Sequence, residues 1–299
     1  MVRTTDPFER IRRAIAARLP DYSVHSTVKL GEGLDNQAYE INGELVVRLS
    51  NVIPDSLRAE TVKREADLLA AVGSISTLPV PKPVFMSPEE GCLAYFKLPG
   101  VSLLELARQH QSTWEPSVAR ALGGFLTALH GTSIETVVAF ANREHVELVE
   151  WRAEAADCYS RVCAEIPAPY RLAHEAFLAS PVAEPSYTAV FSHNDLGIEH
   201  VLVDPVTREV TGIIDWSDAA IVDPANDFGL LLRDLGPAAL DLALCGYRGH
   251  TNDIAALRER AQFYARCKVL EDLAYGLESG RSLYVDKSIA TMSWLFLSA

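Results

Sequence analysis

The chain has 299 residues, of which 48% are hydrophobic and 22% charged, and its net charge is −13. This is the composition of a globular protein with a sizeable core and room for two lobes. No basic cluster lies beyond the N-terminal segment, no apolar run could span a bilayer, and no signal peptide is evident. The five cysteines lack the spacing of a disulfide framework or a zinc site. We therefore expect a cytoplasmic protein without a nucleic-acid or membrane partner.

One helix and three strands are expected in residues 1–50. The N-terminal segment is typical of a short amphipathic helix, with one apolar face made of Phe8, Ile11, Ile15 and Leu19. Residues 24–50 alternate strand-like runs with turns: "GEGLDN" (31–36) is rich in glycine, and Asn42-Gly43 is the strongest short hairpin signal. We expect three antiparallel strands, the first two joined by the glycine-rich turn.

A helix is predicted to follow, starting near residue 55 and ending at Gly73. Glu65 falls on its apolar face. That face also carries Val62, Leu69 and Val72. A carboxylate among inward-facing residues needs a cation, and Arg48 of the preceding strand is the nearest candidate.

Extended segments at 78–87 and 91–103 complete the first part of the chain. Helical patterns dominate after that, apart from residues 186–222. We place the boundary between an N-lobe of residues 1–97 and a C-lobe of residues 98–299.

Between its apolar ends, the segment "VFSHNDLGIEHVLVD" (190–204) holds two histidines and two acids, Asp195 and Glu199, and a third acid, Asp204, closes it. Buried apolar runs rarely carry so many ionisable groups unless these are paired or functional. His200 follows Asp195 by five positions, and Asp215 ends "VTGIID". The residues between them are typical of two short strands around a turn, which would bring Asp215 back beside the loop.

This arrangement is suited to phosphoryl transfer. One carboxylate would orient the attacking hydroxyl, a second carboxylate and a further ligand would hold Mg²⁺, and the glycine-rich turn would cover the phosphates. Arg48 could hold phosphate oxygens.

The chain resembles the aminoglycoside phosphotransferase family over nearly its whole length. The matching segments are "LGEGLDNQAYEI", "LVVRLS", "VKREADLL", "LPVPKPV", "LAYFKLPG", "ALGGFLTALH", "HNDLGIEHVLVD" and "GIIDWSDAAIVDPANDFGLLL". The resemblance implies an α+β, bilobal, protein-kinase-like fold. Its N-lobe would be an antiparallel sheet with one helix, and its C-lobe would be mainly helical.

The resemblance also implies roles for individual residues. Asp195 matches the catalytic base and His193 the histidine that braces its loop, while His200 and Asp215 match the Mg²⁺ ligands. Asp227 matches an acid that supports the loop. ATP or GTP would contact Gly31, Gly33, Asn36, Arg48, Glu65, Ala94, Tyr95 and Phe96.

Two positions depart from the protein-kinase pattern. Arg48 stands where protein kinases have lysine, and His200 stands where asparagine is usual. A histidine at the second position is typical of 2″-type aminoglycoside kinases and macrolide kinases, which favours those subfamilies. The gatekeeper residue, which influences the choice of nucleotide, is either Ala94 or Tyr95.

We expect a monomeric antibiotic-modifying enzyme that moves the γ-phosphate of ATP or GTP to a hydroxyl of an aminoglycoside. One alternative is a kinase for a macrolide, a peptide antibiotic, or a metabolite such as choline, homoserine or a sugar. A different kind of alternative is an inactive kinase-like binding protein, although intact Asp195 and Asp215 argue against it.

A cationic acceptor needs carboxylates near Asp195. The segment 263–280 has the length and glycine stop of a helix. Within it, Glu271 and Glu278 share a face and Asp272 lies beside that face. Asp227, Asp234 and Glu199 could add to the negative field. An ordinary solvated helix face would show the same pattern.

Overall fold

The computed structural model describes residues 6–32, 36–51, 55–107, 115–249 and 253–296. The chain forms two compact units, Met1–Pro99 and Gly100–Ala299. Across the described ranges, no helix combines the length and the apolar character needed to cross a membrane.

The N-terminal unit is built on an antiparallel sheet with strand order β1-β2-β3-β5-β4. Its elements are α1 (Pro7–Arg18), β1 (Thr27–Glu32), β2 (Asn36–Ile41), β3 (Leu45–Ser50), α2 (Asp55–Ile75), β4 (Pro83–Ser87) and β5 (Cys92–Phe96). The three predicted antiparallel strands are confirmed. Asn42 and Gly43 both have positive φ, 54° and 77°, as a tight hairpin requires.

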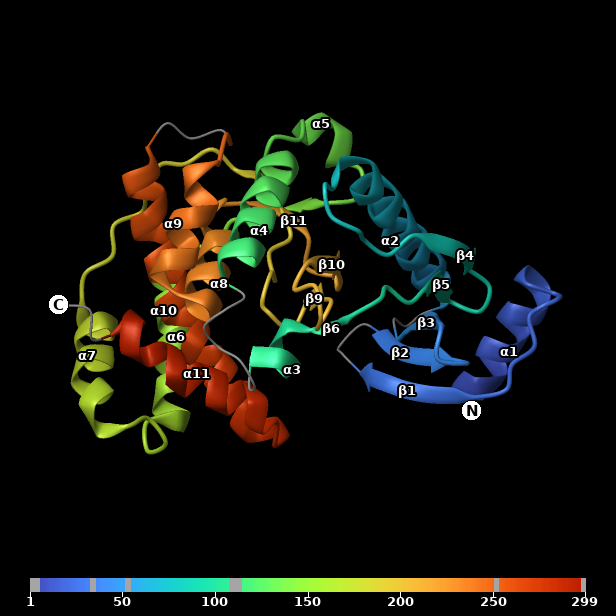
Figure 1. The fold of residues 1–299 in the computed structure, drawn as a ribbon, viewed down its shortest axis with the longest axis horizontal. Coiled ribbons are helices and arrows are strands. Elements are labelled where there is room, and N and C mark those ends of the chain that lie inside the picture. The colour runs from blue at the N-terminus through green and yellow to red at the C-terminus, as the bar shows by residue number, and fades with distance from the viewer. Residues whose placement is uncertain (1–5, 33–35, 52–54, 108–114, 250–252, 297–299) are drawn as a thin grey trace. The chain divides into compact units, whose positions relative to one another are not determined.

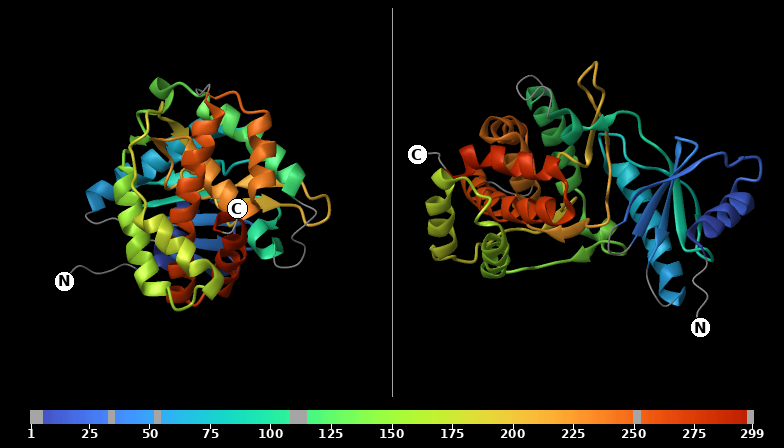
Figure 2. Two further views of the ribbon diagram at one scale, coloured as in Figure 1. Left: turned by 90° about the vertical axis from the view of Figure 1, so that its left-hand side faces the viewer. Right: turned by 90° about the horizontal axis from the view of Figure 1, so that it is seen from below.

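Helices α1 and α2 cover opposite faces of this sheet (Figure 2). Leu45, Val47 and Leu49 of β3 join the buried core that α1 completes. Side chains alternate along a strand, so Arg48 points to the other face and pairs with Glu65 of α2 (Nε–Oε1 2.8 Å). The ion pair predicted from the sequence is therefore present.

The predicted end of α2 at Gly73 is wrong, because the helix continues to Ile75. Glycine lowers helix stability by only about 1 kcal/mol, and the helical bonding continues as far as the Ser76 N–H, which donates to Val72 O. The Ser76 hydroxyl then bonds to both backbone groups of Leu78 and turns the chain.

The C-terminal unit is mainly helical (Figure 1). Its elements are β6 (Val101–Ser102), α3 (Leu103–Ala107), α4 (Glu115–His130), α5 (Ile134–Val137), β7 (Asn142–Arg143), α6 (Leu148–Val162), α7 (Ala168–Ala179), β8 (Val190–Ser192), β9 (Val201–Val203), β10 (Val210–Ile213), β11 (Ala220–Val222), α8 (Ala225–Leu235), α9 (Pro237–Cys245), α10 (Ile254–Ser279) and α11 (Ser282–Leu295). Helix α10 packs against α6, α8 and α11, and α4 packs against α9. Two small sheets, ordered β10-β9-β6 and β7-β11-β8, complete the unit.

The predicted hairpin after the 190–200 segment is confirmed as β9 and β10. Val201 pairs with Ile213, and the Ile214 N–H donates to His200 O at 3.0 Å. This pairing holds Asp215, the next residue, beside the loop that links β8 to β9.

Helix α10 ends as predicted but begins earlier. Gly280 follows it in the left-handed conformation, with φ of 70°, which suits a glycine. The helix begins at Ile254 rather than at residue 263, because the Asp253 side chain caps it by accepting the Ala256 N–H at 2.9 Å.

Adjacent glycines in α4 provide a test of the packing between α4 and α9. A Cβ at Gly123 would lie 2.6 Å from the Ala243 carbonyl oxygen of α9, whereas a Cβ at Gly124 would meet nothing within 4 Å. We expect Gly123→Ala to lower the free energy of unfolding by about 1–3 kcal/mol through overpacking. Gly124→Ala should raise it by up to about 1 kcal/mol, because alanine favours the helix. Denaturant unfolding of both variants checks this, and equal effects would contradict the close packing.

Candidate active site

His193 opens the loop between β8 and β9 and is completely buried. Its Nδ1 accepts the Asp195 N–H at 3.3 Å, and its Nε2 lies 3.1 Å from Ile214 O, which can only accept. The ring is therefore neutral, with its proton on Nε2. Burial lowers the pKa of His193 and keeps it in that form. The histidine thus links the loop to the residue before Asp215.

Asp227, in the first turn of α8, holds the same loop through its side chain. Its carboxylate accepts the His193 N–H at 3.1 Å and the Asn194 N–H at 2.8 Å. The His130 Nε2 lies 3.1 Å from it, and the Tyr247 hydroxyl lies 2.9 Å from the His130 Nδ1. Asp227 is fully buried, so it supports the loop from inside the unit. The sequence analysis did not single out His130 as a site residue, although it closes the "ALGGFLTALH" segment.

His200 connects Asp195 to Asp215. Its Nδ1 donates to the Asp195 carbonyl oxygen at 2.8 Å, which leaves Nε2 facing Asp215 Oδ2 at 3.8 Å. Burial would lower the pKa of His200, but the charges of Asp195, Asp215 and Glu199 outweigh it and raise that pKa. The Asp195 and Asp215 side chains are 34% and 45% exposed, so both carboxylates can reach a bound molecule.

The pair of His200 and Asp215 fits a magnesium ion. Two ligands of one Mg²⁺, each about 2.1 Å away, can be no more than about 4.2 Å apart, and the 3.8 Å separation meets that limit. The other Asp215 oxygen accepts the Ser217 hydroxyl at 3.0 Å. Nowhere in the described ranges do three or more His, Cys, Asp or Glu side chains form a metal centre. Mg²⁺ usually combines one or two protein carboxylates with substrate phosphates and water.

Asp218 belongs to the same negatively charged group, although the sequence analysis missed it. The pKa of its carboxyl is raised, first by desolvation and then by the charges of Asp195 and Asp215. Its position three residues after Asp215, in "DWSD", was the available signal.

In the N-terminal unit, the two candidate gatekeepers lie on opposite faces of the sheet. Ala94 pairs with Val47 and lies in the core completed by α1. Tyr95 pairs with Val46 and therefore lies on the face of Arg48. Gly33 lies outside the described residues. Gly31 and Asn36 lie on either side of that segment, and Phe96 is half exposed at the end of β5.

Of the predicted acceptor carboxylates, Asp227 is buried and engaged by the loop, and the others fall into two groups. Asp234 and Asp272 are in contact with the buried cations Arg233 and Lys287. Glu271 and Glu278 are exposed on α10. Of these, Glu278 pairs with Arg161, and Glu271 lies 3.8 Å from the Lys268 ammonium.

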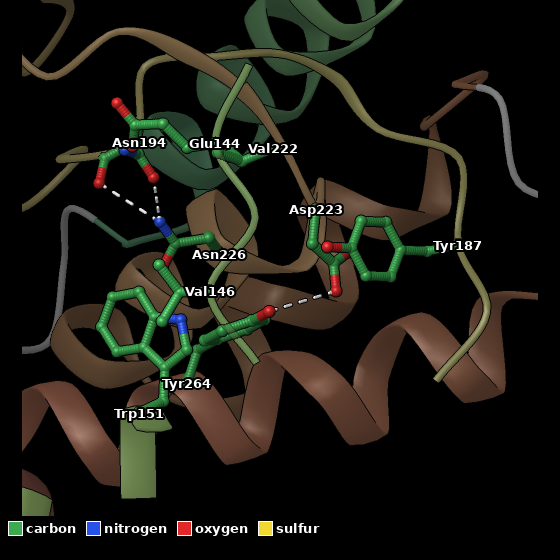
Figure 3. A pocket seen from close by; sticks show the side chains of 9 residues that line it. All are labelled: Glu144, Val146, Trp151, Tyr187, Asn194, Val222, Asp223, Asn226 and Tyr264. Carbon is green, nitrogen blue, oxygen red and sulfur yellow. Dashed lines mark hydrogen bonds between the residues drawn. The ribbon is translucent and has the colours of Figure 1, made fainter. Parts of the chain in front are cut away.

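A hollow of about 330 Å³, part of it open to solvent, lies beside Asn194 (Figure 3). Asn226 donates from its amide to Asn194 O at 3.3 Å and to Asn194 Oδ1. Trp151, Tyr187 and Tyr264 supply aromatic walls. Asn226 thus fixes the residue before Asp195 and was also missed from sequence.

Comparison with known proteins adds independent information. Residues 26–264 match the model of the phosphotransferase enzyme family. Viomycin phosphotransferase from Streptomyces vinaceus is 29% identical over 241 residues, covering 75% of this chain and 83% of that enzyme. The GDP and kanamycin complex of APH(2″)-IIIa superposes with a TM-score of 0.67 at 23% identity, covering 95% of this chain and 97% of that one. A macrolide 2′-phosphotransferase from Brachybacterium faecium gives a TM-score of 0.60 at 25% identity, with coverage of 93% and 96%.

These similarities confirm the fold expected from the sequence. It is a protein-kinase-like α+β fold with an antiparallel sheet in its N-terminal unit and mostly helices in its C-terminal unit.

The contacts of Asp227 lead to a prediction about stability. Asp227→Asn would replace an acceptor oxygen with an amide that faces N–H donors, so we expect the free energy of unfolding to fall by about 3 kcal/mol. Asp241→Asn is the control, because that carboxylate is 60% exposed and pairs with Arg258 at the surface. It should change stability by less than about 1 kcal/mol. Thermal and denaturant unfolding measure both, and a silent Asp227→Asn would contradict the supporting role.

Proposed function

The chain belongs to the phosphotransferase enzyme family, and from this membership we propose that it transfers the γ-phosphate of ATP or GTP to a hydroxyl of an aminoglycoside antibiotic. The observation that carries the proposal is the geometry of Asp195, His200 and Asp215, which brings two exposed carboxylates and an imidazole together at the end of a hairpin.

In this proposal Asp195 orients the acceptor hydroxyl and accepts its proton. The backbone of Asp195 is held on both sides: its N–H donates to His193 Nδ1, and its carbonyl oxygen accepts from His200 Nδ1. A positioned group of this kind contributes mainly by orientation and proton transfer. His193 stays neutral and structural.

Asp215 and His200 would hold Mg²⁺ through Oδ2 and Nε2. When bound, the ion would neutralise charge on the transferring phosphoryl group. The His200 Nε2 can act as a ligand only in its unprotonated form. Burial lowers the pKa of His200, but the charges of the neighbouring carboxylates raise it overall.

The N-terminal unit, residues 1–97 in our proposal, would bind the nucleotide. Arg48, held by Glu65, would hold phosphate oxygens. Tyr95 is the better gatekeeper candidate because its side chain shares the face of Arg48. The described residues around the glycine-rich turn, Gly31 and Asn36, would present backbone N–H groups. A relative's GDP complex supports testing GTP beside ATP as the donor.

The acceptor would bind to the C-terminal unit, residues 98–299, through carboxylates near Asp195. Asp218 and Glu271 are the best placed of the exposed acids, since Asp234 and Asp272 are neutralised by buried cations. The similarity to viomycin phosphotransferase over 241 residues favours viomycin as a second candidate acceptor. The enzyme would act as a monomer in the cytoplasm, where its nucleotide is present.

A phosphorylation screen tests the proposed function. Aminoglycosides, viomycin and macrolides would be offered with ATP and with GTP, and phosphorylated product would be followed by mass spectrometry. Product should depend on Mg²⁺ and disappear with EDTA. Nucleotide binding without turnover on any acceptor would instead favour a kinase-like binding protein.

Asp195→Asn should lower kcat by about 10² or more, because the proton acceptor is lost while the shape is kept. The affinity for the nucleotide should change little. Asp241→Asn serves as a matched control, since it removes an exposed carboxylate of α9 that is distant in sequence from the loop. Steady-state kinetics of both variants measure this, and near-normal turnover by Asp195→Asn would exclude Asp195 from the mechanism.

The acceptor KM should rise with salt if the acceptor is polycationic, because salt screens charges over roughly 8 Å at physiological ionic strength. The KM for the nucleotide should move less.

Glu271→Gln should raise the acceptor KM more than it lowers kcat, the pattern of lost uniform binding. Glu278→Gln should have a smaller effect than Glu271→Gln, because Arg161 already pairs with Glu278. An acceptor KM that is independent of salt, with both variants silent, would point to a macrolide.

A further inference from the structure

A buried ion cluster joins the loop 193–200 to α8, α10 and α11. Its members are Glu199, Arg233, Asp234, Asp272 and Lys287. The Lys287 ammonium lies 2.9 Å from Glu199 and 2.7 Å from Asp272. The Arg233 and Lys287 side chains are only 3% and 5% exposed, so water screens these charges weakly.

Two carboxylates of the cluster hold the loop itself. Asp234 Oδ2 accepts the Ile198 N–H at 3.0 Å. The Glu199 carboxylate folds back over Gly197, where a Cβ would lie 2.4 Å from Glu199 Oε1. Glu199 directly precedes His200, whose N–H donates to Gly197 O at 3.0 Å. A change in the position of Glu199 therefore moves the backbone that carries His200.

Lys287 is the cation closest to Glu199. Arg233 makes its short contacts with Asp234, at 2.7 Å, and with Asp272, at 3.0 Å, and lies 3.6 Å from Glu199. Arg233 therefore directs its short contacts at Asp234 and Asp272 and holds Glu199 less closely than Lys287 does.

The cluster holds three carboxylates for two cations, so it tolerates no further loss of positive charge. Burial, followed by the charges of Glu199 and Asp234, raises the pKa of Asp272 to about 6 even beside both cations. Without Lys287, the Glu199 carboxylate would keep only the longer 3.6 Å contact with Arg233 and would lie buried close to two other acids, which is unfavourable. It would turn towards water and draw the loop with it.

We propose that Lys287 is a positioning residue: by holding Glu199 it sets the conformation of residues 197–200 and so keeps His200 directed at Asp215. Lys287 and Asp272 lie beyond residue 264, where the match to the family model ends. The consequence for catalysis rests on the proposed function, whereas the effect on the loop does not.

Hydrogen–deuterium exchange on the protein without nucleotide or metal tests the effect on the loop. In Lys287→Met we expect the amides of Ile198 and His200 to exchange at least tenfold faster. Lys287→Arg keeps the charge and should stay within about threefold of the parent. Unchanged exchange in Lys287→Met would overturn the proposal.

Two controls separate a local effect from general destabilisation. Arg258→Met removes a cation of the same unit that pairs with Asp241 on the surface, and it should leave the loop amides unchanged. Gly123→Ala lowers stability through the packing of α4 on α9, so it should not single out the loop amides. Selective acceleration of the loop amides in either control would contradict the assignment to Lys287.

Kinetics supply the second readout. With the acceptor found in the screen, Lys287→Met should lower kcat at least tenfold while the nucleotide KM stays within about twofold, and Lys287→Arg should restore most of the loss. If no acceptor is ever phosphorylated, the proposed function fails, but the exchange experiment still decides the role of Lys287.

A double variant covers the case in which Lys287→Met does not fold. Lys287→Met combined with Asp272→Asn removes one cation and one carboxylate, so it keeps the charge balance of the cluster. It still takes the nearest cation from Glu199. We expect this variant to fold and to show the faster loop exchange, and a parent-like loop in the folded double variant would overturn the proposal.

Discussion

The candidate site depends on one buried carboxylate, that of Asp227. Two consecutive backbone N–H groups, of His193 and Asn194, point at it, and His130 and Tyr247 complete the network. Two consecutive amide N–H groups can donate to one carboxylate only if the backbone turns sharply between them. The backbone turns at Asn194, which has φ of 69°. The carboxylate stabilises a left-handed conformation that costs a non-glycine residue about 1–2 kcal/mol. The direction of Asp195, the next residue, follows from that turn.

A second left-handed residue, Asp215 with φ of 60°, lies across from the first. The two turns are coupled, because His193 donates to Ile214 O and the Ile214 N–H donates to His200 O. The residue before each strained residue, His193 in one case and Ile214 in the other, therefore bonds to the other segment. Strain of this kind persists only where the surrounding structure determines it, which is typical of functional sites. The carboxylates of Asp195 and Asp215 stay partly exposed, whereas His193, which makes one of these bonds, is buried.

Local sequence patterns were enough to predict the parts of the fold that are set by residues close together in the sequence. Asn42-Gly43 identified the hairpin, and the apolar face of α2 identified the partner of Arg48. The end of α2 was wrong because glycine is a weak stop inside a helix that packs well. The start of α10 was placed too late because a single capping residue, Asp253, sets it.

The residues missed from sequence act through contacts over long range. His130 reaches Asp227 across 97 positions, and Lys287 reaches Glu199 across 88. No spacing rule connects such residues, because only the packing of α4, α8, α10 and α11 brings them together. Asn226 and Asp218 were closer to recognised motifs. Their roles depend on which way the side chain points, and that is set by the turns at Asn194 and Asp215.

The distribution of charge in the C-terminal unit limits how an acceptor can be recognised. The chain has a net charge of −13, yet several acids near the loop are already neutralised by Arg233, Lys287 and Arg161. Asp218 adds to the negative charge of Asp195 and Asp215, whereas the exposed Glu271 lies 3.8 Å from the Lys268 ammonium. Salt screens the attraction between exposed charges over roughly 8 Å at physiological ionic strength. In the proposed function, selection among cationic acceptors would depend on which hydroxyl reaches Asp195 while an amine of the same molecule reaches Asp218 or Glu271. The buried cluster would contribute to this selection indirectly, because it holds the loop that carries Asp195.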